Sequence, residues 1–218
     1  MKSSSTFSVK KLVLLAMFAA ISFLAVFLIR IPVVLFLKYE PKDVIITIGG
    51  FLLGPMAAFL ISLIVSLLEM FSISETGLIG CVMNLLSTCS FACTAAFFYK
   101  KRHTLSGAAI GLTLGSVLMV IAMLLWNWLI TPWYMGVNRQ EVAAILLPVF
   151  LPFNLLKAGL NSALILGLYK PLVTALRKVG LVDSNPGTSK TSKAGVFLFS
   201  AALLITCIFF LLVIQGKI

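Results

Sequence analysis

Lys157 is the residue of this sequence whose position most strongly suggests chemistry, because it lies in the middle of a long apolar stretch, LPFNLLKA at 151–158. A charge at the centre of a membrane span costs roughly 2.5 to 3.5 kcal/mol even on lenient insertion scales. Asn154 lies three residues before it and Asn161 four residues after it, so the three side chains share one helix face. This face is either a hydrogen-bond cluster inside a helix bundle or part of a ligand pocket. The absence of an obvious acidic partner in the span favours the pocket.

A second candidate segment is WNWLITPWY at 126–134, where Asn127 lies between aromatic rings. Flat aromatic side chains with nearby donors and acceptors suit a planar heteroaromatic ligand. The alternative is an aromatic belt at the membrane interface, which explains Trp133 and Tyr134 equally well. Asn127 lies about one turn deeper, and its position favours a ligand contact.

Two further polar residues lie within apolar runs, Glu69 and Asn84. A buried carboxylate can be the counter-ion of a lysine, or it can lie at the membrane interface. Asn84 can face the same cavity as Lys157 or form an interhelical hydrogen bond. The sequence leaves both alternatives open.

Catalytic and metal-binding motifs are missing from the sequence. It contains no phosphate-binding loop, no H-E-x-x-H, no serine–histidine pairing and no paired carboxylates within a span,. The single histidine, His103, lies in a basic loop, and the four cysteines lie in apolar segments without a C-x-x-C pair,. We therefore predict no catalytic residues, no bound metal and no cofactor, and any active transport would need an external source of energy.

The composition is that of an all-α integral membrane protein. Hydrophobic residues make up 61% of the 218 positions and charged residues 11%, against about 25% charged in soluble domains. Seven apolar runs predict helices, at about 12–29, 44–53, 56–71, 78–99, 107–130, 143–176 and 196–214,. Gly54-Pro55 separates the second run from the third, which predicts a tight helical hairpin.

The positive charge lies mostly between the apolar runs. There are 17 Lys and Arg against 6 Asp and Glu, and no basic face carries interleaved aromatic residues, so the lipid bilayer and not nucleic acid is the expected partner. With a cytoplasmic N-terminus, most of these residues fall on the inner side. The predicted organisation is a membrane domain at 1–178, a polar linker at 179–194 and an additional transmembrane helix at 195–218.

Small residues recur at four-residue spacing in three places, and such ridges allow helices to approach closely. Gly107, Gly111 and Gly115 form the longest series, for which packing inside the protein is the expected role. Ala16 and Ala20 form a shorter one that could serve a partner protein instead.

Three stretches carry a resemblance to a known family: LKYEPKD at 37–43 leading into GGFLLGP at 49–55, the Asn127 segment, and LPFNLLK at 151–157. Over residues 10–178 the chain resembles the substrate-binding S components of energy-coupling factor (ECF) vitamin transporters, in particular the riboflavin-specific members. Lys42 and Ile45 depart from residues common in these relatives. The seventh helix lies outside their six-helix unit.

The resemblance implies a six-helix bundle with a vitamin site that opens to the outside of the cell membrane, in a bacterium of the Gram-positive type. It implies that riboflavin is the transported substrate, that a transmembrane T component docks on Ala16 and Ala20, and that two ATPase subunits drive release. The expected substrate-binding residues are Asn127, Asn154, Lys157, Asn84, Tyr39, Glu40 and Asp43, with the first linker and the Arg139 loop capping the site. Two alternatives stay open: an S component or carrier for FMN or another vitamin, and a structural membrane protein whose polar residues join helices.

Overall fold

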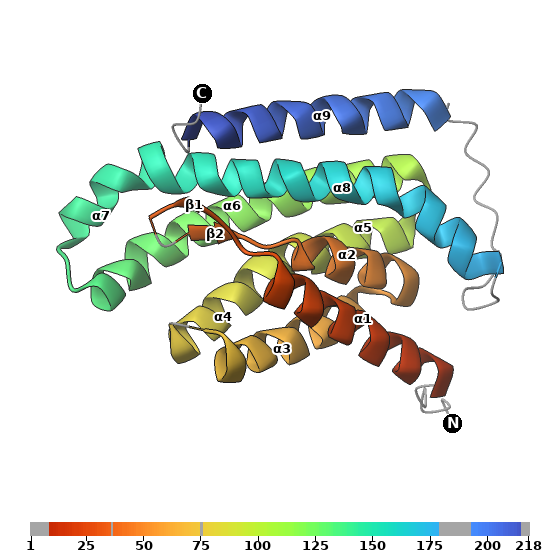
Figure 1. The fold of residues 1–218 in the computed structure, drawn as a ribbon, viewed down its shortest axis with the longest axis horizontal. Helices are drawn as coiled ribbons and strands as arrows, with labels where there is room; N and C mark the ends of the chain where they lie inside the picture. Colours follow the sequence, from red (N-terminus) through yellow and green to blue (C-terminus); the bar gives the residue numbers. More distant parts are fainter. Residues whose placement is uncertain (1–8, 36, 75, 179–192, 215–218) are drawn as a thin grey trace.

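The computed structural model describes residues 9–35, 37–74, 76–178 and 193–214 (Figure 1). In these residues it forms a bundle of long helices with one small β-hairpin. The elements follow in this order: α1 (Val9–Leu28), β1 (Ile31–Val34), β2 (Leu37–Tyr39), α2 (Lys42–Leu53), α3 (Pro55–Ser72), α4 (Gly77–Thr88), the π-helix η1 (Cys89–Cys93), α5 (Thr94–Lys101), α6 (Leu105–Met135), α7 (Arg139–Ile145), the π-helix η2 (Leu146–Phe150), α8 (Leu151–Lys178) and α9 (Lys193–Ile214). The predicted linker at 179–194 lies outside the described residues except for its last two positions.

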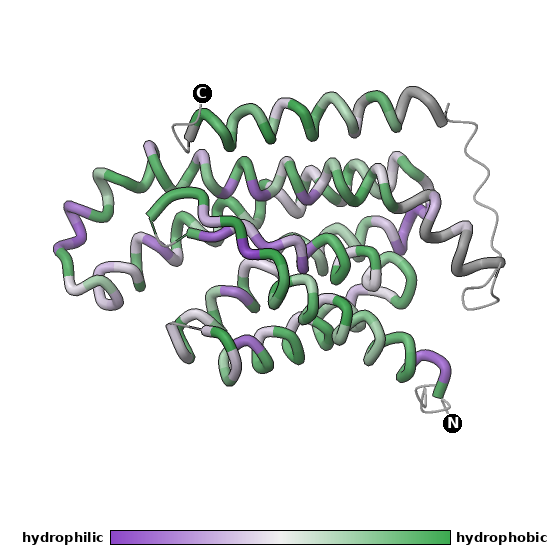
Figure 2. The backbone as a smooth tube through the Cα atoms, in the orientation of Figure 1, coloured by the Kyte–Doolittle hydropathy of each residue, from purple (hydrophilic) through white to green (hydrophobic). Residues whose placement is uncertain are grey.

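Five helical segments among the described residues are long and apolar enough to cross a membrane, namely Val9–Leu28, Pro55–Ser72, Gly77–Lys101, Leu105–Met135 and Arg139–Leu168. Helix α9 contains a shorter apolar stretch, Ser200–Val213. Most positions along these helices are hydrophobic, and hydrophilic positions occur near the β-hairpin, in α7 and in the middle of α8 (Figure 2). The prediction of an all-α membrane protein is confirmed.

The predicted hairpin of helices α2 and α3 is also present. Gly54 has a φ of +101° between the two helices, a backbone conformation that glycine adopts at little cost, and Pro55 begins α3,. Helix α2 has 12 residues and is therefore only about 18 Å long, shorter than the roughly 30 Å hydrocarbon core of a bilayer. It must lie among the other helices, and most of its residues are buried.

The glycines of α6 allow close contact with the segment formed by η1 and α5. A Cβ atom on Gly111 would lie 2.7 Å from the carbonyl oxygen of Ala95, and one on Gly115 would lie 2.6 Å from that of Phe91. A side chain at either position would therefore meet backbone, which cannot rotate away. Internal packing, the expected role of this glycine series, is confirmed.

We predict that Gly111→Leu strongly destabilises the bundle, because the new side chain must push α6 away from Ala95. Overpacking of this kind costs about 1 to 3 kcal/mol or more. The measurement is the thermal unfolding midpoint in detergent. Ala109→Leu, on the exposed side of the same helix, is the matched control and should leave the midpoint unchanged; equal midpoints for both variants would contradict the packing assigned to Gly111.

The first linker, for which the sequence analysis predicts no strand, forms an antiparallel β-hairpin after α1. Ile31 pairs with Tyr39 and Pro32 with Lys38, with a bulge between Pro32 and Val34. Leu35 has a φ of +50°, which reverses the chain. The hairpin lies between α8 and the short helix α2 (Figure 1).

Two π-helical turns interrupt the long spans, η1 after Thr88 and η2 before Leu151. Pro148 lies within η2 and Pro152 just after it, and a proline has no N–H to donate to the preceding turn. These prolines thus coincide with a π-helical turn. Single π-helical turns occur frequently at functional sites, and both of these adjoin the cavity residues described next.

Candidate functional site

A cavity lies between the hairpin, α4, α6 and α8. Its volume is about 120 Å³, and it is partly open to solvent. Its lining consists of Arg30, Leu37, Lys38, Glu40, Ser74, Thr76, Met83, Asn84, Ser87, Met123, Tyr134, Phe153, Asn154 and Lys157. The cavity therefore combines apolar walls with amide, hydroxyl and charged groups.

Lys157 lines this cavity and has an acidic partner from another helix. Its Nζ lies 3.0 Å from Oδ2 of Asp43, which is fully buried in the first turn of α2. The hydroxyl of Thr88 donates to Oδ1 of Asp43 at 2.7 Å, and the amide of Asn161 donates to Oδ2 at 3.3 Å. Asp43 therefore compensates the charge of Lys157 without itself lining the cavity. The ammonium group of Lys157 has further N–H donors that can bond to a ligand in the cavity.

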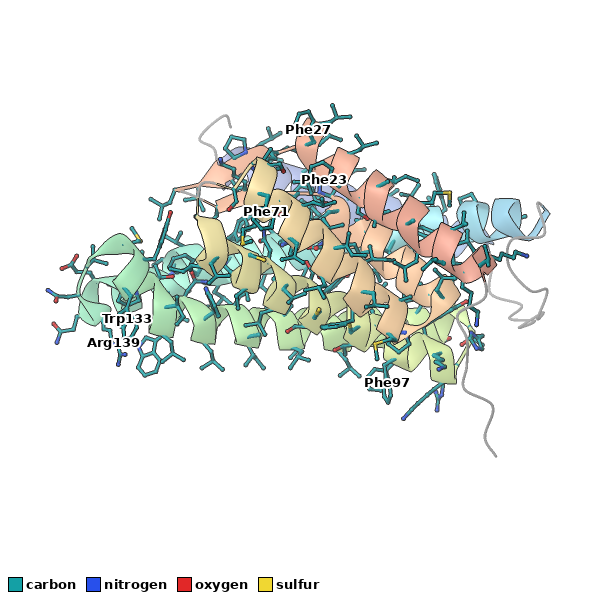
Figure 3. All side chains as sticks on the ribbon, turned by 90° about the horizontal axis from the view of Figure 1, so that it is seen from below. Phe23, Phe27, Phe71, Phe97, Trp133 and Arg139 are labelled. Atoms are coloured by element: carbon teal, nitrogen blue, oxygen red, sulfur yellow. The ribbon has the colours of Figure 1, made fainter. Side chains whose placement is uncertain are left out.

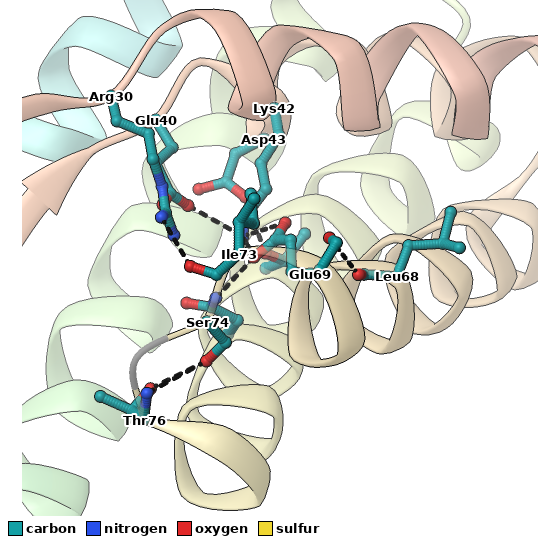
Figure 4. Close-up of polar contacts among 12 residues, drawn as sticks. Arg30, Glu40, Lys42, Asp43, Leu68, Glu69, Ile73, Ser74 and Thr76 are labelled. Carbon is teal, nitrogen blue, oxygen red and sulfur yellow. Dashed lines mark hydrogen bonds and ion pairs between the residues drawn. The ribbon is translucent and has the colours of Figure 1, made fainter.

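A second set of charges adjoins the first (Figure 4). Nζ of Lys42 lies 2.6 Å from Oε2 of Glu69 and 2.9 Å from Oε2 of Glu40. Arg30 donates from Nε to Glu40 at 2.9 Å and from Nη1 to the carbonyl of Ile73 at 3.1 Å. Glu69 is therefore the counter-ion of a lysine, one of its two expected roles. Lys42, which precedes the helix predicted at 44–53, is the first residue of α2 and is buried.

Together these residues form what we call the buried ion network: Arg30, Glu40, Lys42, Asp43, Glu69 and Lys157. It contains three of the six acidic residues of the chain and an equal number of cations, so its formal charge is zero. Burial by itself would raise the pKa of Glu40. The positive charge of Lys42, and then those of Lys157 and Arg30, outweigh the effect of burial and hold the pKa of Glu40 at about 2. Glu40 is therefore ionised at physiological pH.

Two asparagines line the cavity with one N–H already bonded to the protein. Asn84 donates from Nδ2 to Oε2 of Glu69 at 2.8 Å, and Asn154 donates from Nδ2 to the carbonyl of Phe150 at 2.7 Å. These bonds fix the orientation of both amides. Their carbonyl oxygens can accept hydrogen bonds from a ligand, and the second N–H of each remains a donor.

Tyr39 and Asn127 are buried but do not line the cavity. The hydroxyl of Tyr39 donates to Oδ1 of Asn161 at 3.0 Å; burial and the charge of Asp43 raise the pKa of Tyr39, so it stays a neutral donor. Asn127 donates to the carbonyl of Met123 at 2.7 Å and accepts from Thr131 at 2.9 Å, both within α6. Contact between Asn127 and a ligand stays a prediction.

The aromatic residues at the end of α6 divide between two environments. Tyr134 lines the cavity, whereas Trp133 is 80% exposed and lies at the outer edge of the molecule (Figure 3). Arg139, in the loop expected to cap the site, lies over the ring of Trp128, 5.6 Å from its centroid, and is not part of the lining. The exposure of Trp133 is that of an interfacial belt, whereas contact between Tyr134 and a ligand stays a prediction.

Much of the lining was not predicted from the sequence. Met83, Ser87, Met123 and Phe153 come from apolar helices in which nothing distinguishes them from lipid-facing neighbours. Arg30 and Lys38 flank the apolar run IPVVLFL at 31–37, and their position at its two ends does not by itself predict that they line a cavity.

No group of three or more His, Cys, Asp or Glu within the described part of the chain could hold a metal ion. The four cysteines are free thiols. The donors and acceptors around the cavity are those of a site that binds a polar organic molecule. Lys157 supplies charged N–H donors, Asn84 and Asn154 supply amides, and Met83, Met123 and Phe153 supply apolar surface,.

Comparisons with known proteins agree with this description. Residues 10–169 match the family model described as ECF transporter, substrate-specific component. The riboflavin transporter RibU of Staphylococcus aureus is 28% identical over 78% of this chain and 94% of its own length. The riboflavin transporter FmnP of Bacillus subtilis is 30% identical over 68% of this chain and 84% of its own length.

A solved structure supports the same relationship. The S component of a bacterial ECF transporter superposes with a TM-score of 0.65 at 27% identity, over 77% of this chain and 98% of that one. Most of the chain, including α1 to α7 and the cavity-lining part of α8, lies within the matched family model. The protein described here therefore belongs to the family of substrate-specific components of ECF transporters.

Proposed function

We propose that this S component captures riboflavin from outside the cell for ATP-driven uptake. The observation that carries the proposal is the cavity in which the ammonium of Lys157 meets the amides of Asn84 and Asn154 beside apolar walls. Relatives of similar length from Staphylococcus aureus and Bacillus subtilis carry the name riboflavin transporter, which supports this choice of vitamin.

The chemistry of the flavin ring matches the groups that line the cavity. Its carbonyl oxygens and unprotonated ring nitrogens accept hydrogen bonds, which Lys157 can donate. Its ring N–H can donate to the carbonyl oxygen of Asn84 or Asn154. The thioethers of Met83 and Met123 offer polarisable contacts to the ring, and the hydroxyls near the α3–α4 turn suit the ribityl chain.

The orientation in the membrane follows from the charged ends of the helices. The N-terminal end of α1, which carries Lys10 and Lys11, lies on the same side of the molecule as α5, whose last turn carries Lys100 and Lys101 (Figure 1). The β-hairpin lies towards the other side (Figure 1). Basic residues favour the cytoplasmic side. The N-terminus is then cytoplasmic and the cavity faces outward.

Uptake requires partners, because the sequence has no nucleotide-binding motif. We assign energy coupling to a transmembrane T component and two ATPase subunits. Ala16 and Ala20 are both exposed on α1, which supports their assignment as the face on which the T component docks, since small residues allow close helix contact.

The first experiment is a titration of the purified protein in detergent with riboflavin. We expect saturable quenching of flavin fluorescence with one riboflavin per chain. Competition with FMN and with other water-soluble vitamins tests the specificity. A lack of saturable quenching would reject riboflavin as the substrate. A higher affinity for another vitamin than for riboflavin would reject it as well.

A further inference from the structure

Helix α9 lies along α8 and runs in the opposite direction, so that its C-terminal end lies near the β-hairpin (Figure 1). It begins at Lys193, beyond the stretch 10–169 that the family model matches. The solved S component is covered over 98% of its length by 77% of this chain. Helix α9 is therefore an addition to the unit that this chain shares with its relatives.

One face of α9 is seated firmly on α8. The buried and half-buried positions of α9 on this face are Ser200, Leu203, Leu204, Cys207 and Leu211, which recur at helical spacing. The hydroxyl of Ser200 donates to the carbonyl of Ala163 at 2.6 Å. A Cβ atom on Gly159 would lie only 2.7 Å from Sγ of Cys207, so the two helices touch where α8 has no side chain.

The same face of α9 reaches the hairpin. Cys207 belongs to a hydrophobic cluster that includes Val33, Leu37 and Tyr39 of the hairpin together with Phe153 of α8. Leu37 and Phe153 also line the cavity. The hairpin and α8 form one wall of the cavity, and α9 packs against the outer side of this wall.

The hairpin needs such support because an isolated pair of short strands is marginally stable at best. Polar contacts also hold it: Arg30 pairs with Glu40 across its base at 2.9 Å, and Tyr39 donates to Asn161 of α8 at 3.0 Å. On its outer side, its apolar residues pack into the cluster that Cys207 completes. A loss of that packing would leave the hairpin held by polar contacts that water can replace.

We propose that α9 is a positioning helix, which holds the β-hairpin against α8 and thereby slows the exchange of ligand between the cavity and the outside. The effect on ligand exchange rests on the proposed function, whereas the effect on the hairpin does not. The two effects can therefore be measured separately.

The test compares two glycines of α8 that face α9. Gly159→Leu displaces Cys207 at the level of the hairpin cluster, and Gly167→Leu, whose Cβ would lie 3.0 Å from Oγ of Ser200, is the matched control farther along the pair. Cys207→Ala weakens the cluster from α9 without changing α8. Each variant is prepared in detergent as the full chain, without ligand.

Hydrogen–deuterium exchange over residues 31–39 is the first readout. We expect at least fivefold faster exchange in Gly159→Leu, a smaller increase in Cys207→Ala, and a change of less than twofold in Gly167→Leu. Stopped-flow dissociation of riboflavin should follow the same order. If Gly159→Leu does not fold, Cys207→Ala against Gly167→Leu decides.

The proposal would be overturned if hydrogen–deuterium exchange in the hairpin were unchanged in both Gly159→Leu and Cys207→Ala. It would also be overturned if Gly167→Leu increased this exchange as much as Gly159→Leu does, because α9 would then support the whole bundle. If hairpin exchange rises as expected but riboflavin does not bind the unmodified protein, the riboflavin assignment fails and the role of α9 stands. If riboflavin binds and its dissociation is unaffected by faster hairpin exchange, the hairpin does not control ligand exchange and that part of the proposal is overturned.

Discussion

Asp43→Asn is expected to destabilise the protein by about 3 to 5 kcal/mol, the cost of leaving a buried charge without its partner. Asp43 is completely buried and accepts from Thr88 at 2.7 Å while it pairs with Lys157 at 3.0 Å. Asparagine keeps the shape of the side chain but not the charge, so the ammonium of Lys157 loses its counter-ion. The measurement is the free energy or midpoint of unfolding in detergent.

A double variant separates the charge pair from the rest of this site. Asp43→Asn combined with Lys157→Met removes both charges and should recover a large part of the lost stability, because no unpaired ion remains. Glu141→Gln changes an exposed carboxylate and serves as the control, with no expected change. A double variant as unstable as Asp43→Asn alone would show that the Thr88 and Asn161 contacts, not the ion pair, carry the effect.

Lys157→Met is expected to weaken riboflavin binding by about 10- to 150-fold, since a hydrogen bond to a charged group contributes about 1.5 to 3 kcal/mol. Lys157 is the charged donor that lies both in the cavity lining and against Asp43. Its removal also leaves the Asp43 carboxylate, now 3.0 Å from Nζ of Lys157, without a cation between it and the cavity. Quenching of flavin fluorescence measures the affinity.

The matched control for this prediction is Lys100→Met, which changes an exposed lysine in the last turn of α5 and should leave affinity within twofold of the unmodified protein. The alternative in which polar residues only join helices predicts that Lys157→Met destabilises the protein, because it leaves the buried Asp43 carboxylate without its partner,. It also predicts that no vitamin binds in a way that depends on Lys157. An affinity unchanged by Lys157→Met would reject the assignment of this lysine to the ligand.

The polar face of α8 could be predicted because helical spacing alone places Asn154, Lys157 and Asn161 on one side. The structure confirms this shared face, with the first two residues in the cavity lining and Asn161 beneath them, bonded to Asp43. The acidic partner could not be predicted, since it comes from α2, a helix far away in the sequence. Such pairing depends on how helices pack, which leaves no local pattern in the chain.

The first linker and Asn127 show two other reasons why the sequence does not predict every feature of the site. Val33 and Val34 favour a strand, but Pro32 argues against one except at an edge or a bulge, and the hairpin has its irregularity next to Pro32. Asn127 satisfies its amide with the carbonyl of Met123 in the preceding turn, a bond that asparagine forms locally. A position among aromatic rings therefore does not by itself indicate a ligand contact.

The equal number of cations and anions in the buried ion network has a consequence for the energetics of transport. Moving one elementary charge across a membrane potential of about 100 mV costs or releases about 2.3 kcal/mol. Arg30, Lys42 and Lys157 balance Glu40, Asp43 and Glu69, so a displacement of the network as a unit moves no net charge through that field. The voltage across the membrane then neither drives nor opposes such a displacement, and ATP hydrolysis by the partner subunits does not have to work against it.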